Sequence, residues 1–300
     1  MQHKNQLTIM TLQQLEYVLA VSEYQQFVKA AEVCGITQST LSSMIKKLED
    51  ELDLVIFDRN SHPVKPTLAG ENIIRQARIV LYHAHQLQES TLSERQQSSG
   101  HIKIGVTPTI APYIIPKLFQ YIDAIPELSM SASELHRDKI LKQLKNAELD
   151  MAIISLPHKD EQLLEIPLYH ETFFAFVSPK DPLFEKKEIC SSTMPRERMW
   201  TLKHEISFQL QVSEFCDQES ERRSHYEAGN ISTLLHIVRE TDGFTAIPEL
   251  HIPMLRGEDL TKIRPLVNPV PKRLVSLFVR KDYVREKLLN IIADGIKQIV

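Results

Sequence analysis

Apolar residues near the start of the chain recur at helical spacing. One stripe has intervals of four, three and four residues and consists of Leu41, Ile45, Leu48 and Leu52. A shorter apolar segment begins at Phe27 and meets this one at Gly35, and Thr37 then offers a side-chain oxygen that can cap a helix start. The pattern predicts a helix, a tight turn and a second helix over residues 27–52, preceded by a helix over residues 12–25.

The polar face of residues 38–52 carries short hydrogen-bonding side chains and one cation, namely Gln38, Ser39, Ser42, Ser43 and Lys46. The acidic residues lie near the C-terminal end of this segment, at positions 49–51. An α-helix fits the DNA major groove, and Gln, Ser and Lys side chains bind base edges or phosphates. An ordinary amphipathic helix with its polar face in water has the same composition, so this pattern alone leaves both interpretations open.

The pattern changes to a short β-rich run after residue 54, with a polar turn at residues 60–63. It predicts a small hairpin, or wing, on which Arg59 and Lys65 are placed to touch phosphate. A plain connecting hairpin with solvated charges is the alternative.

A long helix is expected from Thr67 to about Arg95. Its apolar stripe has intervals of four, three, four and three residues and consists of Ile73, Ala77, Val80, Ala84 and Leu87. This heptad spacing is typical of helices that pair along their length. We therefore predict a DNA-binding domain over residues 1–66, a dimerising linker helix over residues 67–97 and an effector domain over residues 98–300.

Short apolar strands alternate with helices after residue 100. Strands are expected at residues 102–106, 128–133, 150–155, 173–177, 245–248 and 274–279, and helices near residues 113–124, 136–146, 209–219, 231–240 and 284–300. The alternation indicates a parallel or mixed sheet covered by helices. Small molecules bind beyond the carboxyl ends of such strands, so Thr107, Thr109 and Ser155 line the expected ligand position, although each can equally be a helix cap.

Composition narrows the class of protein. With 300 residues, 42% of them hydrophobic and 25% charged, the chain is of ordinary globular type. It lacks a long apolar run and a secretory signal, so we expect a cytoplasmic protein with no membrane partner. We find no metal-ligand spacing, phosphate loop or paired catalytic carboxylates, and predict no metal, no cofactor, no catalytic residue and no enzyme activity.

The charge of the chain does not favour nucleic acid by itself. The formal net charge is −4, and residues 1–99 contain nine Lys/Arg against eleven Asp/Glu. Any basic surface must come from local clustering, and a monomer is expected to bind DNA weakly. Dimerisation would raise the affinity.

The chain resembles a LysR-type transcriptional regulator from end to end. The residues that carry the resemblance are Leu15-Glu16, Phe27, Ala30-Ala31, Thr37-Gln38-Ser39, Leu41-Ser42, Ile45, Leu48-Glu49, Leu52, Ile56-Phe57-Asp58-Arg59 and Thr67-Leu68-Ala69-Gly70. The resemblance implies a winged helix-turn-helix, a dimerising helix and a two-lobed α/β effector domain similar to periplasmic binding proteins. By this resemblance lobe I covers about residues 101–170 and 270–300, and lobe II about residues 171–269.

Two residues depart from the pattern of that family. Asp53 stands where a Gly is usual at the end of the recognition helix, so an Asp must tolerate a helix-ending conformation. Ser43 stands where a basic residue is common, which removes one expected DNA contact.

Within the family, the effector half is most similar to the peroxide-sensing OxyR type. The matching residues are Gly105-Val106-Thr107-Pro108-Thr109, Pro112-Tyr113-Ile114-Ile115-Pro116, Leu149-Asp150, Pro167-Leu168, Phe215-Cys216, His225 and Arg273. The resemblance implies a reactive cysteine followed nine residues later by a second one. Cys216 matches the second, but an ungapped count places Ser207 at the first. A serine hydroxyl stays protonated and does not form a sulfenic acid.

Three explanations remain for Ser207: a Cys-to-Ser variant held in the reduced state, a relative that senses something else, or a protein in which Cys216 reacts alone. The resulting hypothesis is a homodimeric or homotetrameric regulator that binds an inverted repeat in double-stranded promoter DNA and has RNA polymerase as a further partner. Its effector is peroxide or, in the alternative, a small organic ligand between the lobes. The sequence leaves open the operator, the target genes and whether the output is activation or repression.

Overall fold

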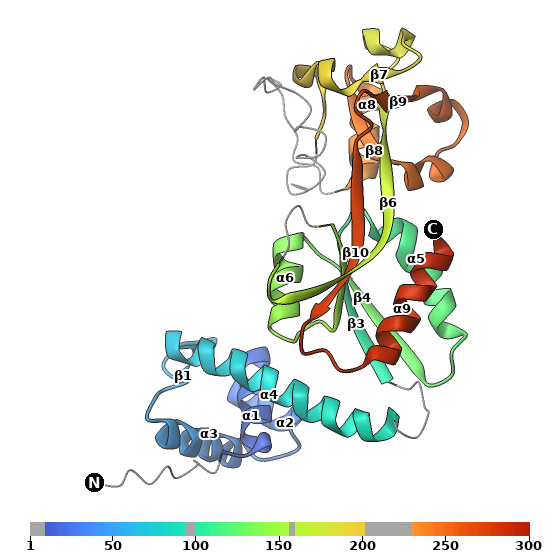
Figure 1. Cartoon of the computed structure of the whole chain (residues 1–300). Helices are drawn as coiled ribbons and strands as arrows, with labels where there is room; N and C mark the ends of the chain where they lie inside the picture. The colour runs from blue at the N-terminus through green and yellow to red at the C-terminus, as the bar shows by residue number, and fades with distance from the viewer. Residues whose placement is uncertain (1–9, 94–99, 156–159, 202–229) are drawn as a thin grey trace. The chain divides into compact units, whose positions relative to one another are not determined.

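The computed structural model describes residues 10–93, 100–155, 160–201 and 230–300 (Figure 1). The chain divides into two compact units, one of residues 1–97 with 146–148 and the other of residues 98–145 with 149–300. Each unit is described by itself.

The first unit begins with three helices, α1 (Leu12–Tyr24), α2 (Phe27–Val33) and α3 (Gln38–Leu52). The side chain of Thr37 accepts a hydrogen bond from the backbone N–H of Thr40 at 3.2 Å and starts α3. Gly35 lies in the turn with a φ of +67°, a conformation that favours glycine. The predicted helix-turn-helix is confirmed.

The helix α3 ends at Asp53, where a glycine is usual in the family. Asp53 takes the left-handed conformation, with φ 51° and ψ 42°, and its N–H bonds to the carbonyl of Glu49. An Asp visits this region more readily than most residues. The expectation that Asp53 tolerates a helix-ending conformation is therefore confirmed.

The predicted wing is a two-stranded antiparallel hairpin of β1 (Phe57–Asp58) and β2 (Lys65–Pro66). The side chain of Thr67 then accepts the N–H of Gly70 at 2.9 Å and starts α4 (Leu68–Ser93). A Cβ on Gly70 would overlap the carbonyl oxygen of Ile56, so this close approach of backbone to backbone requires glycine. One apolar core joins the three helices, the wing and α4, and contains Leu15, Val18, Ala30, Leu41, Ile45, Leu48, Ile56, Phe57, Ile74 and Leu81.

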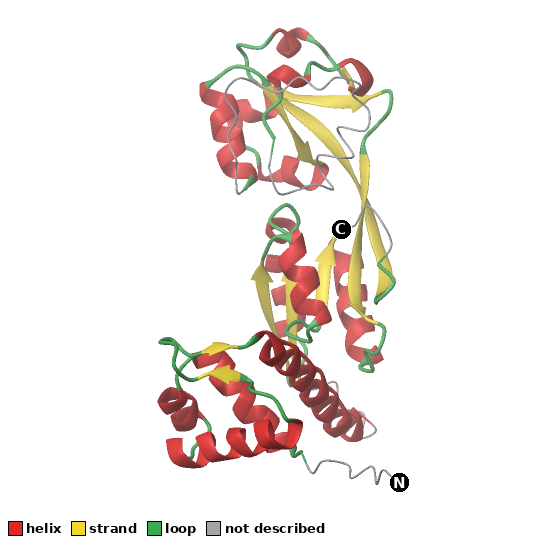
Figure 2. Cartoon of the chain, turned by 90° about the vertical axis from the view of Figure 1, so that its left-hand side faces the viewer, coloured by secondary structure: helices red, strands yellow, loops and turns green. Residues whose placement is uncertain are grey.

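The second unit is a mixed sheet with helices packed on it (Figure 2). Its strands are β3 (Gly100–Val106), β4 (Leu128–Glu134), β5 (Met151–Ile154), β6 (Leu163–Val177), β7 (Ile189–Cys190), β8 (Phe244–Pro248), β9 (Ile263–Val267) and β10 (Lys272–Arg280). Its α-helices are α5 (Ala111–Asp123), α6 (Arg137–Lys145), α8 (Ile231–Glu240) and α9 (Glu286–Ile299), and its 3-10 turns are η1 (Pro182–Glu185), η2 (Ser191–Thr193), η3 (Arg196–Arg198), η4 (Glu249–Met254) and η5 (Gly257–Lys262).

The strand order is β4-β3-β5-β10-β6-β9-β7, and β8 also pairs with β6. The strands β3, β4 and β5 are parallel, whereas β10 runs antiparallel to both β5 and β6. The long strand β6 joins the two parts of the sheet. Its first part pairs with β10, and its last part pairs with β8 and β9. The predicted class, a winged helix-turn-helix followed by a mixed α/β domain, is confirmed.

Two details differ from the prediction. The strand expected at residues 173–177 is the last part of the fifteen-residue β6. The short strands β7 and β9 were not expected. The helix expected at residues 209–219 lies outside the described residues.

Candidate nucleic-acid interface and effector site

The polar face of α3 is open to solvent in the first unit. Gln38, Ser39, Ser43 and Lys46 are exposed, Ser42 is half-buried, and Lys65 is exposed on the wing. The hydroxyl of Ser43 is turned back onto its own helix, where it donates to the carbonyl of Thr40 at 2.9 Å. Ser43 is therefore a weaker candidate for a DNA contact than its neighbours.

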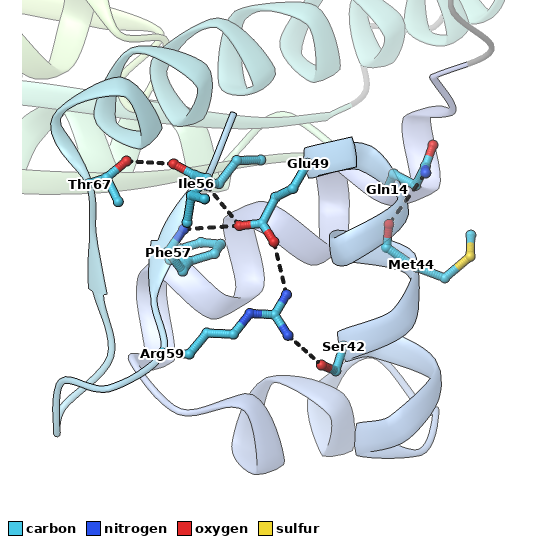
Figure 3. A network of polar contacts seen from close by, with 9 residues as sticks. Gln14, Ser42, Met44, Glu49, Ile56, Phe57, Arg59 and Thr67 are labelled. Carbon is cyan, nitrogen blue, oxygen red and sulfur yellow. Dashed lines mark hydrogen bonds and ion pairs between the residues drawn. The ribbon is translucent and has the colours of Figure 1, made fainter. Parts of the chain in front are cut away.

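A buried carboxylate joins α3 to the wing (Figure 3). Glu49 is 7% exposed, and its Oε1 accepts the backbone N–H groups of Ile56 at 2.7 Å and Phe57 at 3.2 Å. Two charge-assisted hydrogen bonds to backbone are stronger than neutral ones. Glu49 therefore fixes where the wing leaves the helix, a role that its place in an acidic run did not indicate.

Arg59 completes this network (Figure 3). Its guanidinium donates to Oε2 of Glu49 at 2.9 Å and to Oγ of Ser42 at 3.0 Å. It also lies 5.3 Å from the ring centroid of Phe27, within cation–π range. The structure thus brings two of the predicted DNA-binding residues, Ser42 and Arg59, into contact with each other.

In the second unit, three predicted effector residues follow the carboxyl ends of two parallel strands. Thr107 follows β3 and Ser155 follows β5, and these strands are parallel neighbours with Val106 opposite Ile153. Thr107, Thr109 and Ser155 are all buried, with Thr109 fully so. Arg273 lies near the start of β10. Because β10 pairs antiparallel with β5 through Ser276 and Ile154, the start of β10 lies at the carboxyl end of β5.

Arg273 is the centre of a buried polar cluster. Its Nε donates to Oε2 of Glu171 at 2.6 Å, its Nη1 to Oγ1 of Thr109 at 2.9 Å and its Nη2 to the Thr109 carbonyl at 2.9 Å. The ring centroid of Phe173 lies 5.3 Å from the guanidinium carbon. Both Arg273 and Glu171 are almost fully buried, so each depends on the other. Burial raises the pKa of Glu171, and the charge of Arg273 opposes that rise.

A second contact lies close to this cluster. The hydroxyl of Tyr113 on α5 and Nδ1 of His251 on η4 are 2.9 Å apart, with the two rings edge to face. Burial, followed by the charge of Arg239, lowers the pKa of His251. Burial also raises the pKa of Tyr113 and of Tyr169, so both phenols are neutral. Prediction from sequence missed Glu171, Tyr113 and His251 as site residues, because they come from three separated segments.

Two family models match the chain. Residues 12–71 match the bacterial regulatory helix-turn-helix protein model of the lysR family, and residues 95–297 match the LysR substrate binding domain. The chain belongs to the LysR family. It is a DNA-binding transcriptional regulator of LysR type.

Curated relatives of this LysR protein extend over nearly the whole chain. A hydrogen peroxide-inducible genes activator from Dickeya chrysanthemi is 31% identical over 291 residues, 96% of this chain and 95% of the relative. The DNA-binding transcriptional dual regulator OxyR from Escherichia coli K12 is 30% identical over 290 residues, 96% of this chain and 95% of the relative.

Solved structures show the same fold. A full-length OxyR variant from Pseudomonas aeruginosa matches with a TM-score of 0.79 and 30% identity, covering 96% of this chain and 98% of that one. OxyR from Porphyromonas gingivalis matches with a TM-score of 0.63 and 33% identity, covering 67% of this chain and 93% of that one. The resemblance to LysR regulators, and to the OxyR type within them, is confirmed.

The remaining predicted residues of this LysR protein, Ser207, Cys216 and His225, lie outside the described residues. Among the described cysteines, burial and then Glu16 raise the pKa of the Cys34 thiol. Hydrogen bonds from Ser192 and Thr193 lower the pKa of the half-buried Cys190 thiol. The described ranges hold no group of three or more His, Cys, Asp or Glu suited to a metal ion. They also contain no helix that is long and apolar enough to cross a membrane.

Proposed function

We propose that this LysR regulator works in the cytoplasm as a homodimer or homotetramer and binds a two-fold repeat in promoter DNA. The observation that carries the proposal is the exposed polar face of α3 beside the wing, where Gln38, Ser39 and Lys46 are open to a major groove and Lys65 to the backbone. Two-fold protein symmetry then matches two half-sites one or two DNA turns apart. RNA polymerase would be the partner that receives the output.

The exposed side chains of α4 support a dimer. Ala77 packs into the core of the first unit, whereas Val80 is 40% exposed and Leu87 70% exposed. These two residues belong to the heptad stripe, and a second copy of the helix would cover them. We propose residues 67–97 as the dimerising helix, residues 1–66 as the DNA-binding domain and residues 98–300 as the effector domain, with the lobe boundaries given above.

For the effector we propose a hydrogen peroxide response of OxyR type. Its support is the near full-length similarity to relatives named hydrogen peroxide-inducible genes activators. Thr109 and Arg273 are the proposed site residues that the structure describes, and Ser207, Cys216 and His225 are proposed members that lie outside the described residues. In this chain the reactive position by ungapped count is a serine, so peroxide sensing by this chain would rest on Cys216. If Ser207 stands in place of a cysteine, the chain would instead be held in the reduced state.

A small organic ligand is the second candidate, and Ser207 is the observation that favours it. The ligand would lie beyond the carboxyl ends of β3 and β5, beside Thr107, Thr109 and Ser155. Ligand-dependent DNA binding requires that it bind one arrangement of the protein better than another.

One experiment tests these proposals together. Binding of the full chain to genomic fragments is measured under reducing conditions, with peroxide, and with candidate organic acids. A protected inverted repeat near a promoter supports the DNA-binding proposal, and its absence from every fragment contradicts it. Ser207→Cys tests the effector: a gained, peroxide-dependent footprint shift that is reversed by thiol favours the OxyR-type origin. Ser207→Ala is the matched control and gains no response. An unchanged footprint in Ser207→Cys favours the organic ligand.

A further inference from the structure

The hydroxyl of Ser42 has a defined hydrogen-bonding direction. It accepts an N–H of Arg59 at 3.0 Å. A serine hydroxyl has one proton to donate and two lone pairs to accept with. Within the described part of the chain, no acceptor for the proton of Ser42 is present, and Ser42 is half-buried on the polar face of α3. One lone pair is therefore engaged toward the wing, and the proton is left to donate to a partner at the polar face of α3.

Arg59 is held by contacts within the first unit and is not a freely moving cation. One of its Nη groups is used by Glu49, whose carboxylate offsets the positive charge, and the other is used by Ser42. The guanidinium also covers the ring of Phe27, the first residue of α2. Planar, forked donors of this kind fix geometry, which a lysine cannot reproduce. The contacts of Arg59 therefore orient the face of α3 relative to the wing and α2.

We propose that Arg59 is a positioning residue that presets Ser42 as a hydrogen-bond donor to an acceptor atom on a base edge in the major groove. Purine N7, guanine O6 and thymine O4 are such acceptors, whereas the amino groups of adenine and cytosine are not. Ser42 thereby determines part of the operator sequence, and Arg59 determines it through Ser42. The inference rests on the proposed DNA-binding function and names how one of its residues selects sequence.

This role differs measurably from phosphate binding. A phosphate contact adds affinity for all sequences alike, and its loss lowers the slope of log K against log salt by about one. A donor fixed on a base edge discriminates between base pairs, and its loss relaxes one position of the operator by about 5- to 100-fold. Because Arg59 acts through Ser42, removing both residues should relax that position no further than removing one.

The experiment uses the full chain and a pool of random duplexes. The wild type selects its operator, and single base-pair variants of that operator are then titrated with wild type, Ser42→Ala, Arg59→Lys, Arg59→Gln and the double variant Ser42→Ala/Arg59→Lys. We expect Ser42→Ala and Arg59→Lys each to lose discrimination at the same base pair by about 5- to 100-fold, with no further loss in the double variant. Lys65→Gln is the matched control, which should weaken all sequences alike and lower the salt slope by about one.

Arg59→Lys keeps the positive charge but not the forked geometry of the guanidinium. It therefore tests the geometry alone, even if Arg59→Gln fails to fold. Three results would overturn the inference: full discrimination retained in Arg59→Lys, additive losses in the double variant, or an equal loss on all sequences in Ser42→Ala. Failure of the proposed function has a different signature, since a wild-type chain that selects no sequence would leave no operator to titrate.

Discussion

The two units of the molecule contain the same polar arrangement in two settings. In each, an arginine donates to a glutamate and to a hydroxyl and lies 5.3 Å from a phenylalanine ring: Arg59 with Glu49, Ser42 and Phe27, and Arg273 with Glu171, Thr109 and Phe173. Their exposure differs. The side chain of Arg59 is 37% exposed, whereas that of Arg273 is fully buried.

The two glutamates differ as well. Oε1 of Glu49 accepts two backbone N–H groups, whereas Oε1 of Glu171 is buried and has no hydrogen-bond partner among the described residues. A buried charge without its partner is costly, but a charge that keeps two backbone donors loses less. The same chemistry is thus a structural requirement in the effector unit and an adjustable contact in the DNA-binding unit.

The largest expected effect is on the buried arrangement. Arg273→Met leaves the Glu171 carboxylate buried without its cation, and we expect the effector unit to lose about 3–5 kcal/mol of unfolding free energy. Trp200, the single tryptophan, is buried in this unit, so its fluorescence during urea unfolding reports on this unit. The double variant Arg273→Met/Glu171→Leu is the control, because removing both charges should restore most of the loss. No recovery in the double variant would contradict the explanation by an unpaired charge.

The same substitution in the first unit should cost less. Arg59→Met leaves Glu49 with its two backbone donors, and the side chain of Arg59 is itself 37% exposed, so we expect a loss of about 1–2 kcal/mol. Circular dichroism at the helical band reports the helices of both units, so a melting transition that shifts in this signal while Trp200 fluorescence stays unchanged belongs to α1 to α4. An equal loss for Arg59→Met and Arg273→Met would show that burial does not separate the two arrangements.

The same contrast explains what sequence could predict. The helices α1 to α3 and the end of α3 at Asp53 depend on local periodicity and capping, which the sequence displays. Glu49 and Glu171 each stand in polar surroundings in the sequence, and only the backbone N–H groups of the wing or the guanidinium of Arg273 make them interior residues.

The strands show a similar limit. The first part of β6 contains Pro167 and mixes polar with apolar residues without a regular alternation, so only its apolar end was predicted. β9 contains Pro265 and has only five residues. Both strands gain stability mainly from non-local pairing, which periodicity does not reveal. Among the proposed effector residues, Thr107, Thr109 and Ser155 could be named from the sequence because strand ends can be predicted, whereas His251 has no signal of this kind.

A smaller effect is expected at Tyr113. Tyr113→Phe removes the hydroxyl that lies 2.9 Å from His251 and should lower the unfolding free energy of the effector unit by about 1 kcal/mol. The measurement is again Trp200 fluorescence in urea. Tyr121→Phe, on the same helix and partly buried, is the matched control and should change little. A loss as large as that of Arg273→Met would mean that Tyr113 belongs to the buried polar cluster of Arg273 and Glu171.

The smallest expected effect is a pH dependence from His251. Its folded pKa lies below the ordinary value of 6.5, mainly because of burial. As pH falls through that value the unfolded chain binds a proton before the folded chain does, so the unfolding free energy of the effector unit decreases. His251→Asn should remove this part of the decrease between about pH 7.5 and about pH 5.5, as judged from Trp200 melting. Glu171 acts with the opposite sign, since its pKa is raised, but it is present in both proteins and cancels in their difference. An identical decrease in both proteins would mean that the titrating group is not His251.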